Sequence, residues 1–325
     1  MRRREFITLV GGAVAARALA ATTSLAAAQE SYPSKPIRLI APEVPGSATD
    51  ILARIIAAKL AEGLRQPVTV INNFGEAGLI EGIKSPPDGY TMIYGSAGTL
   101  ALLPHIKKVA FDPLTDLTPV GRFVISPTLL AVHPSLPVAS VGDLVALMKA
   151  KPGEYKMATA GFGTAGHFAG VLFNVMAGVN PPVVHYAGGG PAIAAVIDND
   201  AQWTFAPIAG RLPHVRTGKL KAIATGGTRR LAVLPEVPTV AESGIAGYES
   251  VGWGGIFVPN GTPQPVIARL NAAIVAALAS PGAKEEFAKQ GTEPASSTPA
   301  ELAQLLRADH ARLGQVARSI GVKPE

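Results

Sequence analysis

Residues 37–64 read IRLIAPEVPGSATDILARIIAAKLAEGL, and this stretch decides the fold class. Its first five residues form a short apolar run, which is typical of a buried strand. The prolines and the glycine of residues 42–47 interrupt the run and predict a tight turn. From residue 49 to residue 64, apolar side chains recur three and four positions apart, as one face of a helix requires. The stretch is therefore predicted to form a strand, a turn and a helix.

The same pattern recurs along most of the chain. Further strands are predicted at residues 68–71, 90–94, 129–132, 156–159, 183–186, 202–205, 220–225 and 251–258. Helices are predicted at residues 140–151, 164–176, 191–197 and 208–216, and two more begin near residues 262 and 298. Such alternation is typical of α/β proteins in which mostly parallel sheets carry helices on both faces.

Length and composition fit two globular domains. The chain has 325 residues, of which 48% are hydrophobic and 16% charged, so it can bury sizeable cores. It has no cysteine, which excludes disulfides, thiolate metal sites, iron–sulfur clusters and cysteine nucleophiles. It also lacks the H-E-x-x-H zinc motif and the G-x-S-x-G nucleophile elbow. No catalytic residue and no metal site are therefore predicted.

The N-terminal 28 residues are predicted to be an export signal. Arginines at positions 2–4 precede an apolar, alanine-rich segment at residues 7–28, which ends in a cleavage site at Ala28. The arginines resemble a twin-arginine signal, and the alternatives are a membrane anchor or an ordinary helix. The segment holds four arginines and one glutamate, so its removal lowers the formal charge from +6 to +3. That excess is too small to predict a nucleic-acid partner.

Two glycine-bearing turns, each between a predicted strand and a predicted helix, are the candidate binding site. Glycine lets the backbone approach a ligand closely, and the helix that follows offers unpaired N–H groups and the positive end of its dipole. The candidate residues are Gly46, Ser47, Ala48, Thr49 and Asp50 in the first turn, Gly161, Gly163, Thr164 and His167 in the second, and Ser96 and Thr99 in a third turn rich in small residues. The alternative is that these turns need glycine only for their backbone shape.

The second turn also permits a different function. Residues 161–166 spell G-x-G-x-x-G between a strand and a helix, which is the pattern of a dinucleotide-binding turn. Such a site needs an acidic residue about 20 positions further on, but residues 183–187 contain none. An exported oxidoreductase that uses a nucleotide cofactor at Gly161–Gly166 therefore remains the alternative to a binding protein without a cofactor.

Several stretches, in order along the chain, resemble one family. They are residues 32–40 (YPSKPIRLI), 45–50 (PGSATD), 87–91 (PDGYT), 111–113 (FDP), 161–164 (GFGT) with His167, 212–220 (LPHVRTGKL), 234–244 (LPEVPTVAESG) and 259–263 (PNGTP). Together they resemble the solute receptors of tripartite tricarboxylate transporters, known as the Bug family. The resemblance covers essentially the whole chain after the predicted signal.

The resemblance implies a fold, a location and a partner. It implies a two-lobed periplasmic binding protein of type II-like form, with the ligand cleft between lobes formed by residues 32–126 with 253–325 and by residues 127–252. It further implies a receptor without enzymatic activity, which binds a small carboxylate mainly through backbone N–H groups of the first two turns and delivers it to membrane permease subunits. Two or three charge-assisted hydrogen bonds at each end give micromolar affinity without a buried arginine.

The sequence departs from the family pattern around the first turn. Ser47 replaces a glycine, Glu43 stands where an aromatic residue is expected, and Ala206 replaces an aspartate. The segment after Gly78 is also shorter than usual. Because a carboxylate beside an anion site repels the ligand, three roles for Glu43 stay open. It points to solvent, it is protonated and donates a hydrogen bond, or it faces a cationic or amide group of the ligand.

Overall fold

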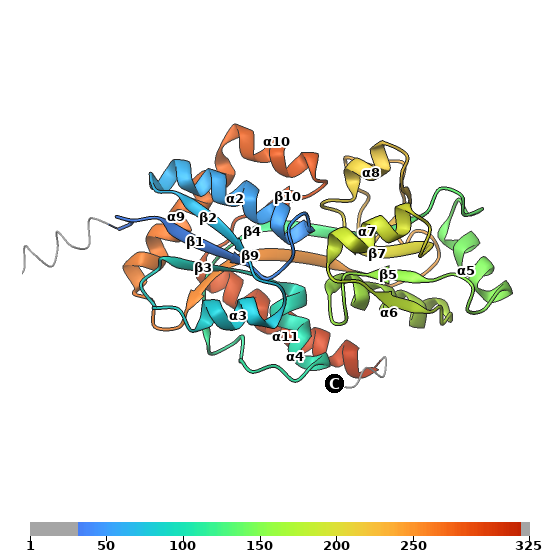
Figure 1. Cartoon of the computed structure of the whole chain (residues 1–325), viewed down its shortest axis with the longest axis horizontal. Coiled ribbons are helices and arrows are strands. Elements are labelled where there is room, and N and C mark those ends of the chain that lie inside the picture. The colour runs from blue at the N-terminus through green and yellow to red at the C-terminus, as the bar shows by residue number, and fades with distance from the viewer. Residues whose placement is uncertain (1–31, 320–325) are drawn as a thin grey trace, which may run out of the picture.

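The computed structural model describes residues 32–319, so the predicted export signal lies outside the described residues. Two α/β halves lie next to each other along the long axis of the molecule (Figure 1). The first half is built from the beginning and the end of the chain, and the second half from its middle. The α/β class predicted from residues 37–64 is confirmed, because that stretch forms β1 (Ile37–Ala41), a turn and α2 (Ala48–Leu64).

The sheet of the first half combines parallel and antiparallel strands. Its parallel strands are β2 (Val68–Asn72), β1 and β3 (Thr91–Ser96), in this order. Next come the antiparallel strands β9 (Val251–Pro259) and β4 (Leu117–Val132), and the short β10 (Glu293–Pro294) pairs with β4. The predicted mostly parallel sheet is thus a mixed one, because β9 and β4 run against their neighbours.

Helices cover both faces of this sheet (Figure 1). They are α2, α9 (Gln264–Ala279) and α10 (Pro281–Lys289) on one face, and α3 (Glu76–Ile83), η1 (Ala97–Leu102), α4 (Leu103–Ile106) and α11 (Pro299–Ser319) on the other. Successive side chains of β3 enter opposite cores, as the alternation of a strand requires. Met92 and Tyr94 pack in the core of α2 and α9, whereas Ile93 packs in the core of α3 and α11.

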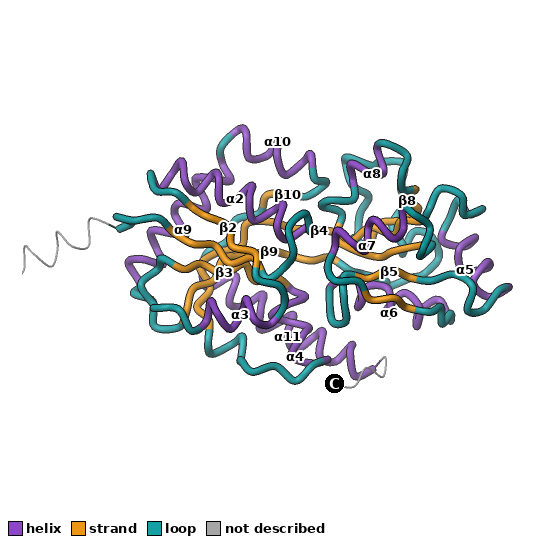
Figure 2. The backbone as a smooth tube through the Cα atoms, viewed as in Figure 1, coloured by secondary structure: helices purple, strands orange, loops and turns teal. Residues whose placement is uncertain are grey.

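The second half repeats this construction on a smaller scale. Its strands are β4, β5 (Met157–Thr159), β6 (Val183–His185), β7 (Trp203–Pro207) and β8 (Lys221–Thr225), and its helices are α5 (Val141–Ala150), α6 (Ala165–Ala177), α7 (Gly189–Ile197) and α8 (Leu212–Arg216). β5 is parallel to β6 and to β7, but β4 is antiparallel to β7 and to β8. Figure 2 shows β4 and β9 passing between the two halves.

β4 changes partners along its length. Residues 117–127 pair with β9, whereas residues 128–132 pair with β7 and β8. The sequence predicted a strand only at residues 129–132, because Pro119 and Pro127 argue against a central strand. The structure accommodates Pro119 next to a shift in register against β9 and places Pro127 where the partners change. Within residues 32–319 no single helix is both long and apolar enough to span a membrane, and the bent pair α9 and α10 passes that test only jointly.

Candidate functional site

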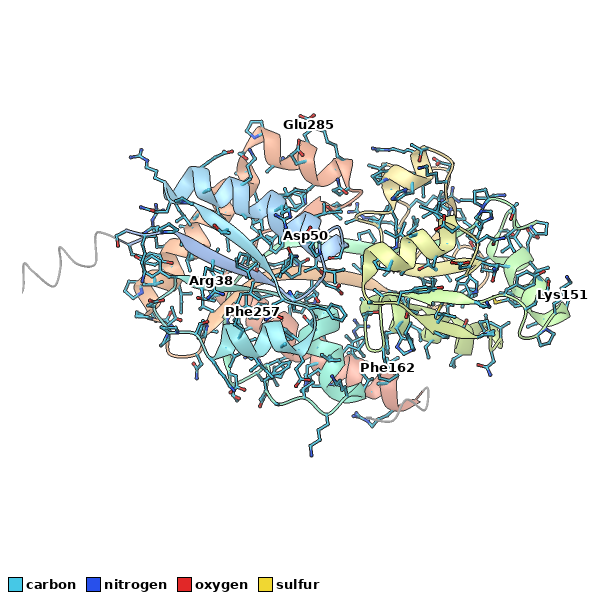
Figure 3. The ribbon with its side chains drawn as sticks, in the orientation of Figure 1. Arg38, Asp50, Lys151, Phe162, Phe257 and Glu285 are labelled. Atoms are coloured by element: carbon cyan, nitrogen blue, oxygen red, sulfur yellow. The ribbon has the colours of Figure 1, made fainter. Side chains whose placement is uncertain are left out.

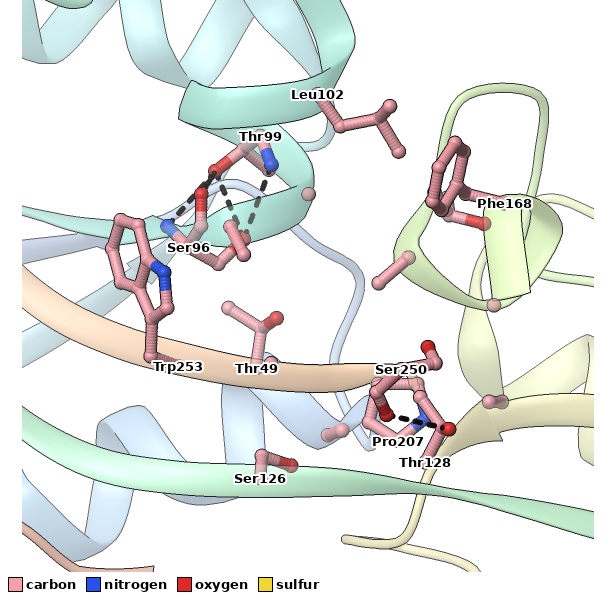
Figure 4. Close-up of a pocket in the computed structure, with 18 of the residues that line it drawn as sticks. Thr49, Ser96, Thr99, Leu102, Ser126, Thr128, Phe168, Pro207, Ser250 and Trp253 are labelled. Carbon is pink, nitrogen blue, oxygen red and sulfur yellow. Dashed lines mark hydrogen bonds between the residues drawn. The ribbon is translucent and has the colours of Figure 1, made fainter. Parts of the chain in front are cut away.

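A cavity of about 130 Å³ lies between the two halves, at the place where β4 and β9 join them. Ser126 and Thr128 of β4 line it together with Ser250, which precedes β9 (Figure 4). Leu102 and Phe168 form an apolar part of its wall, on η1 and α6 respectively. Since one water occupies roughly 10–15 Å³ of such space, the cavity has room for a small organic molecule.

The first turns of α2, η1, α6 and α7 all contribute to the cavity wall. Their residues there include Ala48, Ala97, Ala165 and Gly189, each at the first helical position or immediately after it. The first N–H groups of a helix have no acceptor within the helix, and the helix dipole adds partial positive charge at this end. The cavity is therefore surrounded by N–H donors that favour an anion, as predicted for the glycine-bearing turns.

The two halves approach each other closely on opposite sides of the cavity. A Cβ atom placed on Gly98 of η1 would lie 3.2 Å from the backbone nitrogen of Ala165 on α6. One placed on Gly189 of α7 would lie 3.5 Å from the Cβ of Ser47, which caps α2. The N-termini of helices from the two halves therefore meet around the cavity.

The first turn holds itself together through Asp50, which does not line the cavity. The Asp50 carboxylate accepts hydrogen bonds of 2.9 Å from the Gly46 N–H and from Asn72 Nδ2, and it pairs with Arg54 at 2.8 Å. Burial acts to raise the pKa of Asp50, but these donors outweigh it and hold the pKa below its usual value. Asp50 and the Gly46 N–H thus shape the turn, while Ser47, Ala48 and Thr49 face the cavity. Figure 3 labels Asp50 at the end of α2 that lies next to the second half.

Gly46 is needed for its backbone angle rather than for close approach to a ligand. Its φ is +79°, where side chains are unfavourable, yet a Cβ there would meet no atom within 4 Å. We expect Gly46→Ala to lower the free energy of unfolding by about 1 kcal/mol and to leave ligand affinity within about twofold. Urea denaturation and calorimetric titration check this. A large loss of affinity at unchanged stability would instead return Gly46 to the binding site.

The glycine N–H groups of the second turn likewise donate to side chains of the protein itself. The Gly163 N–H donates to Nδ1 of His167 at 3.2 Å, and the Gly161 N–H donates to Thr159 Oγ1 at 3.4 Å. Burial and the neighbouring His185 lower the pKa of His167 to about 4, so the ring is neutral at physiological pH. Gly161, Gly163 and His167 do not line the cavity, whereas Thr164 does. The second turn therefore offers the N-terminus of α6 rather than its glycines.

The third turn brings both predicted hydroxyl groups to the cavity. Ser96 and Thr99 form a reciprocal cap at the start of η1: the Thr99 N–H donates to Ser96 Oγ at 3.2 Å, and the Ser96 N–H donates to Thr99 Oγ1 at 3.1 Å (Figure 4). Both residues line the cavity. The two hydroxyl groups also hydrogen-bond to each other at 3.1 Å, so at most one of their protons is left for a ligand.

The half-buried Glu43 and the buried Arg211 bring two titratable groups to the cavity. Glu43 lines the wall rather than pointing to open solvent, and burial raises its pKa to about 7 against the lowering effects of the Val44 N–H and Arg211. Arg211 is only 2% exposed, and burial lowers its pKa to about 10 although Glu43 acts in the opposite direction. The guanidinium therefore stays protonated at neutral pH, while Glu43 is close to half-protonated.

Many cavity residues lie outside the predicted set, among them Arg211, Gly189 and Ser126, and the first two of these carry a sequence signal. Arg211 is the single charged residue in the otherwise apolar run at 203–212, and Gly189 belongs to a glycine triplet between a predicted strand and a predicted helix. The same strand–glycine–helix pattern identified the other turns. Ser126 has no comparable signal, because a serine within an apolar strand is common and only the partner exchange of β4 places it at the cavity.

Comparison with known proteins decides between the two function classes. The family model described as the tripartite tricarboxylate transporter family receptor matches residues 52–322. The chain belongs to this family. Protein BugT of Bordetella pertussis is 32% identical over 331 residues, which cover 99% of this chain and 99% of that protein. The predicted resemblance to Bug receptors is thereby confirmed.

Solved structures agree with this assignment. The periplasmic binding protein BugD is 27% identical with a TM-score of 0.87, and the match covers 90% of this chain and all of BugD. A Rhodopseudomonas palustris protein solved with adipate is 32% identical with the same TM-score, and the match covers 90% of this chain and all of that one. This Bug-family chain thus has the two-lobed fold of a periplasmic receptor, and its family places it in the periplasm.

The dinucleotide alternative is overturned. The family is one of solute receptors and not of enzymes. The turn also lacks space for a pyrophosphate at its second glycine, because a Cβ on Gly163 would lie 2.9 Å from the side chains of both Leu103 and Ile106. Its N–H is already bonded to His167. The G-x-G-x-x-G spelling at residues 161–166 therefore reflects the shape of a strand-to-helix turn.

Proposed function

We propose that the protein captures a small dicarboxylate in the cavity between its halves and presents it to the membrane subunits of a tripartite tricarboxylate transporter. The observation that carries this proposal is the convergence of several helix N-termini and the buried Arg211 on one enclosed cavity. The relative solved with adipate supports the same class of ligand. Export by the signal at residues 1–28, with cleavage near Ala28, belongs to this proposal.

The proposed ligand contacts come from both halves. They are the N-terminal residues of α2, η1, α6 and α7, the hydroxyl groups around them, and the charged side chains of Glu43 and Arg211. The proposed residues are Glu43, Ser47, Ala48, Thr49, Ser96, Thr99, Ser126, Thr164, Gly166, Gly189 and Arg211. Charge-assisted hydrogen bonds contribute roughly 1.5–3 kcal/mol each, so four of them offset an association cost of several kcal/mol and leave micromolar affinity.

We further propose that the halves act as two lobes that close on the ligand. The lobes are residues 32–126 with 253–325, and residues 127–252. The change of partners along β4 at residues 127–128 supports the first boundary. The start of β9 at Val251 supports the second, since this strand pairs with the first half. Two strands that cross side by side supply a hinge with few moving dihedral angles.

A thermal-shift measurement tests the proposed ligand class. At 100 times the dissociation constant, adipate or another dicarboxylate is expected to stabilise the folded state by about 2.7 kcal/mol. For a chain of this size that corresponds to a rise in melting temperature of roughly 4 °C. Adipamide, which has the same shape without charge, is the matched control and is expected to give no shift. An equal shift with adipamide, or none with any dicarboxylate, would contradict the proposal.

A further inference from the structure

The cavity contains a buried cation whose hydrogen bonds are incomplete. Arg211 Nη1 donates to the Pro207 carbonyl at 3.1 Å, but Arg211 Nε is buried without a partner. Within residues 32–319 no ion pair joins Arg211 to a carboxylate. Burying a guanidinium without a counter-charge costs free energy. A buried, unpaired arginine in the cavity wall therefore indicates a binding site for an anionic ligand.

A second residue of the cavity wall also carries a buried polar atom without a hydrogen-bond partner. Ser126 Oγ on β4 is buried without a hydrogen-bond partner, and it lines the cavity together with Arg211. Native proteins satisfy nearly all buried polar groups. Of the five such atoms in residues 32–319, the two on Ser126 and Arg211 belong to residues of the cavity wall, so this wall holds unsatisfied polar side chains in addition to the helix N-termini.

Glu43 is the acidic counterpart of Arg211 inside the cavity. Of the other charged residues that line it, Glu249 and Arg312 are both exposed, and Arg312 pairs with Asp309. Asp50, on the helix that follows the Glu43 turn, already forms an ion pair with Arg54 and accepts hydrogen bonds from Gly46 and Asn72. His167, behind the N-terminus of α6, stays neutral. Arg211 is thus the buried charged residue that shares the cavity wall with Glu43 and interacts with it electrostatically.

We propose that Arg211 binds one carboxylate of the ligand and that Glu43 admits the second only when it carries a proton, so that capture of a dicarboxylate takes up a proton wherever Glu43 is ionised beforehand. This inference rests on the proposed function and specifies the protonation state of Glu43 in which that site binds its ligand. In the protonated form Glu43 donates its O–H to the ligand, whereas in the ionised form it repels the ligand. Binding is therefore strongest where Glu43 is neutral.

The charge balance supports this assignment. A dianion neutralises Arg211 and still carries one negative charge, which the helix N-termini stabilise. That remaining charge disfavours ionisation of Glu43 further, so ligand and proton bind cooperatively. The pKa of Glu43 near 7 without ligand places the transition within the physiological range.

Calorimetric titration with adipate at pH 6.5 and pH 8.5 tests the inference. If only the protonated fraction of Glu43 binds, the apparent affinity of the wild type falls by about 25-fold between these values. Glu43→Gln keeps a donor at this position but cannot ionise, so its affinity is expected to change less than about twofold. Glu236→Gln removes an exposed carboxylate outside the cavity wall and is expected to keep the wild-type dependence. Ionisation of adipate itself affects all three proteins equally.

Two outcomes would overturn the inference. An identical pH dependence in the wild type and in Glu43→Gln would show that Glu43 is not the titrating group. An affinity that rises with pH, together with preference for an amino-substituted acid, would show that Glu43 is ionised and binds a cation. Either result leaves the proposed function standing, provided that wild-type protein binds adipate at pH 6.5. Absence of that binding is the separate outcome that contradicts the proposed function.

Discussion

Replacing Arg211 with methionine is expected to stabilise the unliganded protein and to abolish its stabilisation by dicarboxylates. Methionine fills a similar volume but removes a guanidinium whose Nε has no partner, and replacing buried charge by apolar groups is often stabilising by 1–4 kcal/mol. The lost bond to Pro207 offsets part of this gain. We therefore expect a net gain of about 1 kcal/mol, or a melting temperature about 1–2 °C higher.

The same substitution removes the cation that we assign to the ligand. Loss of two charge-assisted hydrogen bonds at roughly 1.5 kcal/mol each lowers affinity by at least about 100-fold. Scanning calorimetry with and without adipate measures both effects on one sample. Arg216→Met, on the exposed surface of α8, is the matched control and is expected to change neither. If Arg211→Met instead destabilised the protein while adipate binding persisted, Arg211 would be a structural residue.

Gly166→Ala is expected to cause the largest loss of stability among the glycines at the cavity wall. Gly166 lies in the first turn of α6, and a Cβ there would overlap the carbonyl oxygen of Phe205 and lie 3.2 Å from the Cα of Ala206. These neighbours belong to β7, so a side-chain rotation cannot relieve the clash. Overpacking of this kind costs roughly 1–3 kcal/mol, and we expect about 3 kcal/mol because backbone must move.

Chemical denaturation checks this value, and adipate titration shows whether the displaced α6 still supports binding. The matched control is Gly63→Ala, in α2, where a Cβ would meet no atom within 4 Å. Alanine is favoured over glycine inside a helix, so this control is expected to gain about 0.5–1 kcal/mol. Equal effects of the two substitutions would mean that contact between α6 and β7 does not limit stability.

Local chemistry determined much of this protein. Apolar spacing in residues 37–64 defined the first strand and helix, because each periodicity follows from the geometry of one element. The helices after the first two candidate turns were likewise predicted, and the structure caps them locally, because the hydroxyls of Ser47 and Thr164 accept backbone N–H groups only three residues away. Motifs along the whole chain further identified the receptor family, which the comparisons confirm.

Tertiary structure decided which groups in those turns are free for a ligand. The sequence placed Gly46 and Gly163 in the site, but Asp50 and His167 bind their N–H groups. That competition depends on side-chain geometry across a turn, which residue types alone do not specify. The direction of β4 and its exchange of partners at Pro127 likewise depend on β7, β8 and β9, which follow about 70 to 140 residues later in the chain.

Glu43 and Arg211 are the clearest case of a feature that only the tertiary structure decides. By itself, the sequence determined an α/β fold with helix N-termini after its glycine-bearing turns, because these features follow from patterns within about twenty residues. Only the fold brings Glu43, which follows β1, and Arg211, which follows β7, to one cavity from opposite halves. Their protonation follows from that burial, since desolvation raises the pKa of the carboxyl and lowers that of the guanidinium. Selection of the ligand's charge is thus set by packing rather than by sequence pattern.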